Sequence, residues 1–145
     1  MKIVLQRVSF ACVTIDRTVT GRIDKGYVAL VGFGAGDDRG KVDKMIDKVH
    51  KLRLFPDENG KTNLSIEEAG GGILIVSQFT LYADCKKGNR PSFTDAAKPA
   101  LAEELYDYFI ERAKVRFSEV AHGVFGAYMQ VDLQNDGPFT VLLED

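Results

Sequence analysis

Apolar residues recur along the chain in short alternating or continuous runs, the pattern that β-strands produce. The first run is long and rich in Val and Ile, and two others are almost uninterrupted, as in strands that are buried on both faces. Six segments predict strands, at residues 2–15, 19–23, 27–34, 73–76, 124–133 and 139–144.

Two further segments repeat their apolar residues at helical spacing, with charged residues between them, which predicts amphipathic helices that cover a sheet. The apolar positions are Val42, Met45, Ile46, Val49 and Leu52 in the first segment, and Leu101, Leu105, Tyr108 and Phe109 in the second, which spans about 98–116.

These elements fit one domain over residues 1–145, without an internal repeat or linker. A chain of this length buries roughly 70% of its unfolded surface, so it needs neither disulfides nor a structural metal to fold. We expect an α/β fold, in which strand-rich mixed sheets form a single compact, barrel-like body with two main helices packed outside.

Composition and charge narrow the class of protein. Hydrophobic residues make up 45% and charged residues 28%, as in soluble globular proteins, and no apolar stretch is long enough to predict a membrane span. The two cysteines, Cys12 and Cys85, form no C-x-x-C pair, which favours a reducing, cytoplasmic setting. With a net charge of −2, the chain lacks the strongly basic surface of proteins that wrap nucleic acid, so an RNA partner would bind locally, by one end.

The supply of reactive side chains excludes several common chemistries. The only two histidines, His50 and His122, stand in no metal-ligand spacing, and the sequence has neither a G-x-S-x-G elbow nor a G-x-x-x-x-G-K-[ST] loop. The glycine-rich residues 32–36 lack the last glycine of a dinucleotide-binding motif. We expect no metal and no cofactor.

Residues 77–81, Ser-Gln-Phe-Thr-Leu, follow a buried strand directly. Polar residues where a rigid strand ends are suited to form a site. Ser77 and Thr80 offer hydroxyls, and a turning backbone offers N–H groups that can stabilise an oxyanion. On composition alone the alternative stays open that this is an ordinary strand, with Phe79 and Leu81 packed inside.

Residues 135–140, Asn-Asp-Gly-Pro-Phe-Thr, stand between the last two predicted strands. Asn, Asp, Gly and Pro in succession are a strong turn signal, so by itself this segment predicts a hairpin turn.

Taken together, S-Q-F-T-L in mid-chain and N-x-G-P-x-T near the end resemble the D-aminoacyl-tRNA deacylase family. Both motifs occur in the family's order and spacing, with no departure in either. The resemblance extends over nearly the whole chain and includes Gln6-Arg7-Val8, Arg90-Pro91-Ser92-Phe93, Leu105-Tyr106-Asp107-Tyr108-Phe109 and Met129-Gln130-Val131.

The resemblance implies a homodimer whose pocket lies at the subunit interface. Gly137-Pro138 would be a cis peptide that enters the partner's pocket, where its carbonyl oxygens face the substrate's α-carbon and exclude an L side chain. A glycine suits this position because it has no Cβ to block the approach. The residues implied for substrate binding and chiral selectivity are Gly137, Pro138, Arg7 (as a brace), Asn135, Thr140 and Met129.

For catalysis the resemblance implies that Ser77, Gln78, Phe79 and Thr80 act on the aminoacylated 3′ end of tRNA. The ribose 2′-OH would help to activate water, and backbone N–H groups around residues 78–80 would bind the ester carbonyl. Phe79 would flank the terminal adenosine. Thr80 as a covalent nucleophile comes second, because a hydroxyl nucleophile needs a base and none is visible.

Lys86, Lys87 and Arg90 lie in a polar loop and are candidates for tRNA phosphate contacts, although a solvated loop is the alternative. Two other functions stay open. The pocket could accept glycyl-tRNA of the wrong identity, since glycine is achiral. Alternatively, the chain could be a non-catalytic nucleic-acid-binding module, which its net charge disfavours.

Overall fold

The computed structural model describes residues 1–145. The strands are β1 (Lys2–Ile15), β2 (Thr18–Ile23), β3 (Gly26–Gly32), β4 (Arg53–Pro56), β5 (Thr62–Ser65), β6 (Gly72–Ser77), β7 (Val120–His122) and β8 (Gln130–Glu144). The helices are α1 (Arg39–Lys51), the short 3-10 helix η1 (Phe79–Tyr82) and α2 (Pro99–Arg116). The expected helices and the expected strands before residue 77 are present, whereas β4, β5 and β7 have no counterpart among the sequence predictions.

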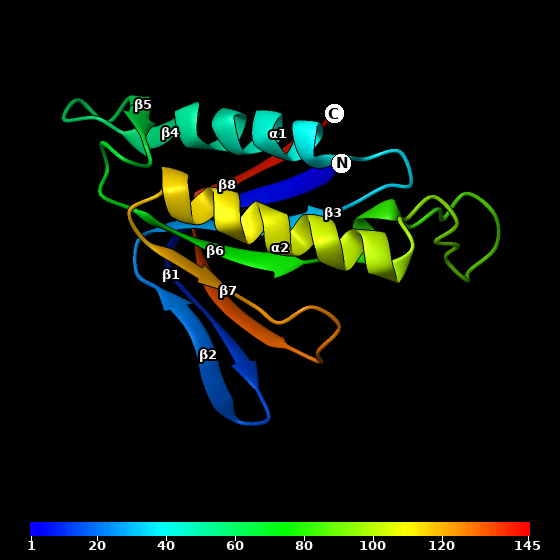
Figure 1. Cartoon of the computed structure of the whole chain (residues 1–145). Helices are drawn as coiled ribbons and strands as arrows, with labels where there is room; N and C mark the ends of the chain where they lie inside the picture. The colour runs from blue at the N-terminus through cyan, green and yellow to red at the C-terminus, as the bar shows by residue number, and fades with distance from the viewer.

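Six strands form one mixed sheet in the order β2-β1-β3-β6-β7, with β8 also paired to β1. The long strand β1 has β8 along one edge, while β3 and β2 share the other edge in succession. The pairs β3–β6 and β6–β7 are parallel. At the far end β2 meets β7, where a Cβ on Gly21 would lie 2.9 Å from the carbonyl oxygen of His122. The sheet therefore curls into a nearly closed barrel, as the fold class predicts (Figure 1).

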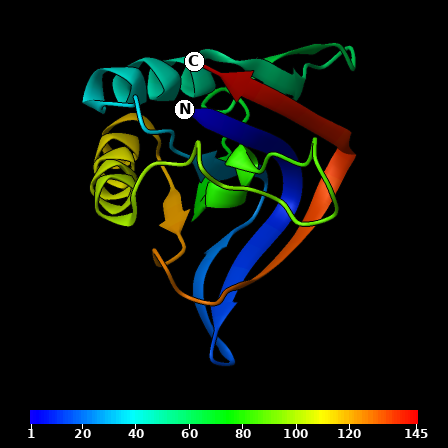
Figure 2. The ribbon, with the colours of Figure 1, turned by 90° about the vertical axis from the view of Figure 1, so that its right-hand side faces the viewer.

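Both α-helices pack side by side on the outside of this barrel (Figures 1 and 2). The predicted apolar face of α1 is buried, through Val42, Met45, Ile46 and Val49. On α2 the buried face includes Tyr106 rather than Tyr108. Tyr108 instead lies between the helices, where its hydroxyl donates to the carboxylate of Asp43 at 3.0 Å.

A second group of apolar side chains fills the barrel itself, apart from the core between the sheet and the helices. Its buried residues come from β1, β2, β3 and β6: Val8, Ala11, Val13, Ile23, Val28, Leu74 and Val76. Partly buried residues of β7 and β8 pack against them, namely Ala121, Val131 and Leu133. The barrel is a packed body, so a site must form at its rim or on its surface.

The C-terminal tail differs from the sequence prediction. Residues 123–129 are irregular, and β8 is a single strand that pairs with nearly the whole of β1, so the hairpin turn is wrong. The register shifts twice opposite Gln6, Val8 and Phe10, and the additional residues of the turn-like segment are accommodated there as a bulge. Pairing along the full edge of β1 overrides the local turn preference. The Gly137-Pro138 peptide is cis.

Neither α-helix has the combination of length and apolar character that crossing a membrane requires.

Candidate active site

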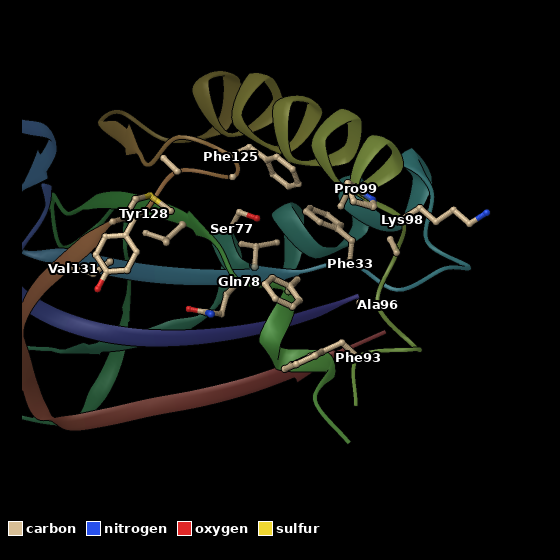
Figure 3. A pocket seen from close by; sticks show the side chains of 18 residues that line it. Phe33, Ser77, Gln78, Phe93, Ala96, Lys98, Pro99, Phe125, Tyr128 and Val131 are labelled. Atoms are coloured by element: carbon tan, nitrogen blue, oxygen red, sulfur yellow. The ribbon is translucent and has the colours of Figure 1, made fainter. Parts of the chain in front are cut away.

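A cavity of about 750 Å³ opens where β6 ends (Figure 3). Its walls come from the ends of β3 and β6, the loop before α2, the first turn of α2, and residues 125–131. Of the 18 lining residues 13 are hydrophobic, and Lys98 is the single charged one. In Figure 3 its side chain points away from the cavity. An apolar cavity with few polar groups suits a flat, uncharged group such as a nucleobase.

The structure brings four of the predicted site residues to this cavity: Ser77, Gln78, Phe79 and Met129. β6 is buried along its length, which holds its end rigidly, and Ser77 pairs with Val31 of β3. Directly afterwards the chain turns into η1, so residues 79–82 are not an ordinary strand. Phe79 is 56% exposed rather than packed inside.

The turn into η1 determines which backbone amides are free. The Gln78 amide donates to the carbonyl oxygen of Val31 at 2.8 Å, which removes it from the expected set of oxyanion donors. The first hydrogen bond of η1 joins the Leu81 amide to the Gln78 oxygen at 3.2 Å. The amides of Phe79 and Thr80 precede it, have no acceptor within the turn and receive no side-chain cap.

The cavity is lined by no His, Asp or Glu side chain, the residues that most often act as general bases. The Thr80 hydroxyl accepts a hydrogen bond from the side-chain amide of Gln78, which is not basic. The His50 ring packs against Phe117, and Nδ1 of His122 lies 2.9 Å from the carbonyl oxygen of Gly123. Neither histidine lines the cavity. Nowhere do three or more His, Cys, Asp or Glu side chains gather as a metal site would require.

Aromatic rings surround the cavity mouth. The rings of Phe79 and Phe93 meet edge to face with centroids 5.0 Å apart, and Tyr128 is 90% exposed. Exposed aromatic faces beside an apolar cavity are suited to stack on an unpaired base. Phe33 and Phe125 lie deeper in the same cavity.

Most of the lining residues were not among the site residues predicted from the sequence, including Phe33, Phe93, Phe125, Tyr128 and Lys98. One signal was present, because residues 124–128 combine apolar residues with a glycine, which is unusual for a strand. The residues outside this segment are far apart in sequence, and only the fold brings them together.

The Gly137-Pro138 corner lies away from the cavity of its own chain. It is opposite Arg7, which pairs with Tyr27, and Tyr27 pairs with Ile73 of β6. Ser77 is four residues farther along β6, and three strand spacings separate β8 from β6. At about 3.3 Å per residue and 4.8 Å per strand, the offset is about 13 Å along the strands and 14 Å across them.

Hydrogen bonds hold the corner in its shape. The side-chain oxygen of Asn135 accepts from the Phe139 amide at 2.6 Å, and its Nδ2 donates to the Thr140 hydroxyl at 2.9 Å. Gly137 has a φ of +148°, and a Cβ there would lie 2.8 Å from the amide nitrogen of Phe139. Only glycine fits this backbone without strain.

The candidate phosphate-binding residues Lys86, Lys87 and Arg90 are exposed in the loop between η1 and α2. None of the three forms an ion pair. Reciprocal backbone hydrogen bonds between Asp84 and Ser92, of 2.7 and 2.9 Å, close the base of this loop. The loop therefore projects its cations into solvent beside the cavity-lining Phe93.

Asp37 is the one buried charged side chain, and it supports the cavity from behind. Its carboxylate accepts from the N-terminal ammonium at 2.7 Å, the Gly34 amide at 2.7 Å and the Lys41 ammonium at 3.1 Å. Burial alone would raise the pKa of Asp37, but these three hydrogen bonds outweigh it and hold the pKa below the ordinary value. Gly34 follows the lining residue Phe33, so this ion pair holds one end of the cavity wall.

Comparison with known proteins identifies the family. The family model described as D-Tyr-tRNA(Tyr) deacylase matches residues 4–144. The chain belongs to the D-Tyr-tRNA(Tyr) deacylase family. This confirms the expected class of activity: the protein is an enzyme, a D-aminoacyl-tRNA deacylase.

Relatives of this deacylase support the assignment over its full length. A D-aminoacyl-tRNA deacylase from Clostridioides difficile (strain 630) is 51% identical, covering 99% of this chain and 97% of the relative. Another with that name, from Lactobacillus gasseri, is also 51% identical, with 99% of both chains covered.

Two solved structures share the fold of the deacylase. The structure of a protein named "c-Myc DNA Unwinding Element Binding Protein" is 40% identical with a TM-score of 0.95, and covers 100% of this chain and 99% of its own. A probable eukaryotic D-amino acid tRNA deacylase is 17% identical with a TM-score of 0.87, covering 98% of this chain and 97% of its own, and shows the fold alone.

Proposed function

We propose that the cavity at the end of β6 binds the aminoacylated 3′ end of tRNA and hydrolyses its D-aminoacyl ester. The terminal adenine would occupy the apolar cavity beside Phe79. The observation that carries this proposal is the pair of free amides at the start of η1, that of the lining residue Phe79 and that of the next residue, Thr80, beside a cavity lined by no His, Asp or Glu. Two amides in this arrangement suit the oxyanion that forms when an ester carbonyl is attacked.

The proposed reaction takes its proton transfer from the substrate, because the cavity is lined by no His, Asp or Glu. A water oxygen attacks the ester carbon, and the ribose 2′-OH takes part in removing the water proton. The bond between the carbonyl carbon and the 3′ oxygen then breaks, and that oxygen takes up a proton. The products are tRNA with a free 3′-OH and the free D-amino acid. Thr80 acts through its amide, since its hydroxyl has no base to activate it.

Chiral selection requires a second subunit in this proposal. The Gly137-Pro138 corner is too far from the cavity of its own chain, yet it is exposed and held rigidly. The outer edge of the 15-residue strand β8 is unpaired, and such an edge is a surface suited to association with another copy. In the homodimer, each corner would reach the partner's cavity and block an L side chain by steric exclusion.

The same rigid wall admits achiral glycine, so glycyl-tRNA of the wrong identity is a second substrate in this proposal. The loop with Lys86, Lys87 and Arg90 would contact phosphates near the 3′ end. These contacts are local, in agreement with the net charge of −2.

A deacylation assay on matched substrates tests the proposal directly. D-Tyr-tRNA and L-Tyr-tRNA carry the same RNA and differ only in the configuration of the α-carbon. We expect rapid release of D-tyrosine and a rate for the L-ester close to that without enzyme. Equal rates for both esters would contradict chiral selection, and no release of either would contradict the ester-hydrolase function.

A DNA-binding role is the second candidate, because the 40% identical solved structure is that of a protein named for binding a DNA unwinding element. Titration with duplex DNA at physiological salt separates the two functions. Tight binding without ester turnover would favour the binding role, and binding that disappears at this salt concentration would exclude it.

A further inference from the structure

We propose that Tyr106 is a positioning residue for this site, and that its hydroxyl holds the cavity wall of residues 123–129 against the end of β6. The proposal rests on the function proposed above and extends it to a residue that touches no substrate. Tyr106 is 1% exposed, one helical turn beyond the lining residue Ala102. It therefore acts on the cavity only through its neighbours.

The phenol connects the two walls of the cavity. Its hydroxyl lies 2.9 Å from the carbonyl oxygen of Ile75 in β6 and 3.2 Å from that of Gly123. A phenol has one proton, so these two acceptors share it. The Gly123 amide donates to the same Ile75 oxygen at 2.8 Å. Strand and wall thus meet at one carbonyl group, and Tyr106 bridges them from behind.

Close packing around residues 123–129 leaves them little room to adjust if the hydroxyl of Tyr106 is removed. A Cβ on Gly123 would lie 2.5 Å from the sulfur of Met129, so the chain is tightly folded back on itself here. The ring of Phe125 lies 6.0 Å from the ring of Tyr106, centroid to centroid. Phe125 and Met129 both line the cavity. The position of Tyr106 therefore determines where these two lining side chains lie.

Tyr106 also lies close to the end of β6, on the side of the cavity that carries the proposed catalytic residues. Burial is the main reason that the pKa of Tyr106 lies above its ordinary value, and the backbone of Ser77 opposes that rise. Ile75, whose carbonyl oxygen accepts from the phenol, is two residues before Ser77 in β6. A phenol with the ordinary pKa of about 10 is already protonated at neutral pH, and the raised pKa of Tyr106 keeps its hydroxyl a donor at higher pH as well.

Removing the hydrogen bonds of the Tyr106 hydroxyl should disturb the alignment of the ester in the cavity more than it lowers the affinity for tRNA. The ester carbon must lie beside the amides of Phe79 and Thr80 while the nucleotide contacts Phe125 and Met129 on the opposite wall. The phosphate contacts are elsewhere, in the loop before α2. A displacement of about 1 Å at a reacting centre can lower the rate about 100-fold.

The test compares Tyr106→Phe with Tyr108→Phe. Both variants remove one hydroxyl from α2, but the Tyr108 hydroxyl bonds to Asp43 of α1, away from the cavity. We measure kcat and KM for D-Tyr-tRNA per folded protein, and hydrogen exchange of residues 123–129. For Tyr106→Phe we expect kcat to fall about 10- to 100-fold with KM nearly unchanged, and exchange to become faster. Tyr108→Phe should change neither.

A parental kcat in Tyr106→Phe, or unchanged exchange of the wall, would overturn the proposal. So would an equal loss in both variants, because it would indicate general destabilisation. If Tyr106→Phe does not fold, Phe125→Leu removes the ring that packs on the phenol. Because Phe125 also lines the cavity, hydrogen exchange of residues 123–129 is then the readout, and exchange as slow as in the parent protein would refute the proposal. A parent protein inactive on D-Tyr-tRNA would instead contradict the proposed function, and hydrogen exchange would still decide whether the phenol holds the wall.

Discussion

The guanidinium of Arg7 donates to the main-chain oxygen of Asp136, immediately before Gly137-Pro138, at 2.9 Å. Nη1 of the same guanidinium donates to the carbonyl oxygen of Leu54 at 2.6 Å, and the group lies over the ring of Phe139, 4.7 Å from the centroid. One side chain thus connects both flanks of the exposed corner to β4. These contacts hold the corner rigidly although it is exposed to solvent.

Gly137→Ala should strongly impair deacylation. The new Cβ would meet the Phe139 amide at 2.8 Å in a conformation that L residues rarely adopt, so the corner must shift. We expect kcat/KM on D-Tyr-tRNA to fall by about 100-fold or more, since a displacement near 1 Å has that effect. Gly60→Ala is the matched control, because Gly60 also has a positive φ but lies in open space in the β4–β5 connection. Full activity of Gly137→Ala would discredit the carbonyl wall.

Thr80→Ala should retain most of the deacylase activity. The substitution removes the hydroxyl but leaves the Thr80 amide, which is the proposed donor to the oxyanion. Single-turnover rates on D-Tyr-tRNA check this. A loss on the order of a million-fold, typical of removing a nucleophile, would instead identify Thr80 as a covalent catalyst.

A tRNA that ends in 2′-deoxyadenosine, charged at its 3′ oxygen, should be hydrolysed far more slowly. If the 2′-OH supplies the proton transfer that no side chain provides, its removal should cost about 10²- to 10⁴-fold in rate. A tRNA with the deoxy sugar at the preceding nucleotide is the control. Equal rates for the two substrates would rule out RNA assistance.

Replacing Lys86, Lys87 and Arg90 together by alanine should raise KM and leave kcat nearly unchanged. Each lost phosphate contact should reduce the slope of log K against log salt by about 1. A triple alanine variant of Lys48, Lys51 and Arg53 removes the same charge from another exposed surface. If both triple variants have the same salt dependence, the loop makes no specific phosphate contact.

Asp37→Asn should destabilise the protein at neutral pH and much less in acid. The folded-state pKa of Asp37 is lowered, so its stabilising contribution is complete above the unfolded pKa of about 4 and is lost as pH falls through the folded value. Removing one partner of this buried pair should cost about 3 kcal/mol at pH 7.

Urea unfolding of the parent, Asp37→Asn and Asp38→Asn between pH 7 and pH 3 measures this dependence. Asp38 caps α1 by accepting from the Lys41 amide, and asparagine caps a helix equally well, so Asp38→Asn should behave like the parent. A stability difference between Asp37→Asn and the parent that does not narrow in acid would contradict the assignment.

Local patterns were sufficient for most elements. The apolar spacing of α1 and the buried run of β6 each depend on contacts that repeat within one element, and both elements formed where the pattern predicted them. The same holds for polar residues after β6, because the rigid end of a buried strand is a local feature. Two motifs in order were enough to indicate the family, although the cross-subunit geometry they imply stays a prediction.

Only the tertiary structure determined the rest. The turn signal at Asn135–Pro138 is genuine, but the edge of β1 offers hydrogen-bond partners on both sides of it, and β8 stays one strand. The Gln78 amide is lost as an oxyanion donor because the carbonyl oxygen of Val31 in β3 accepts its hydrogen bond. Phe33, Phe93 and Tyr128 share a cavity only after the barrel has curled. Sequence spacing records what neighbours along the chain can do, whereas a site made by separated strands depends on which backbone groups the fold has already paired.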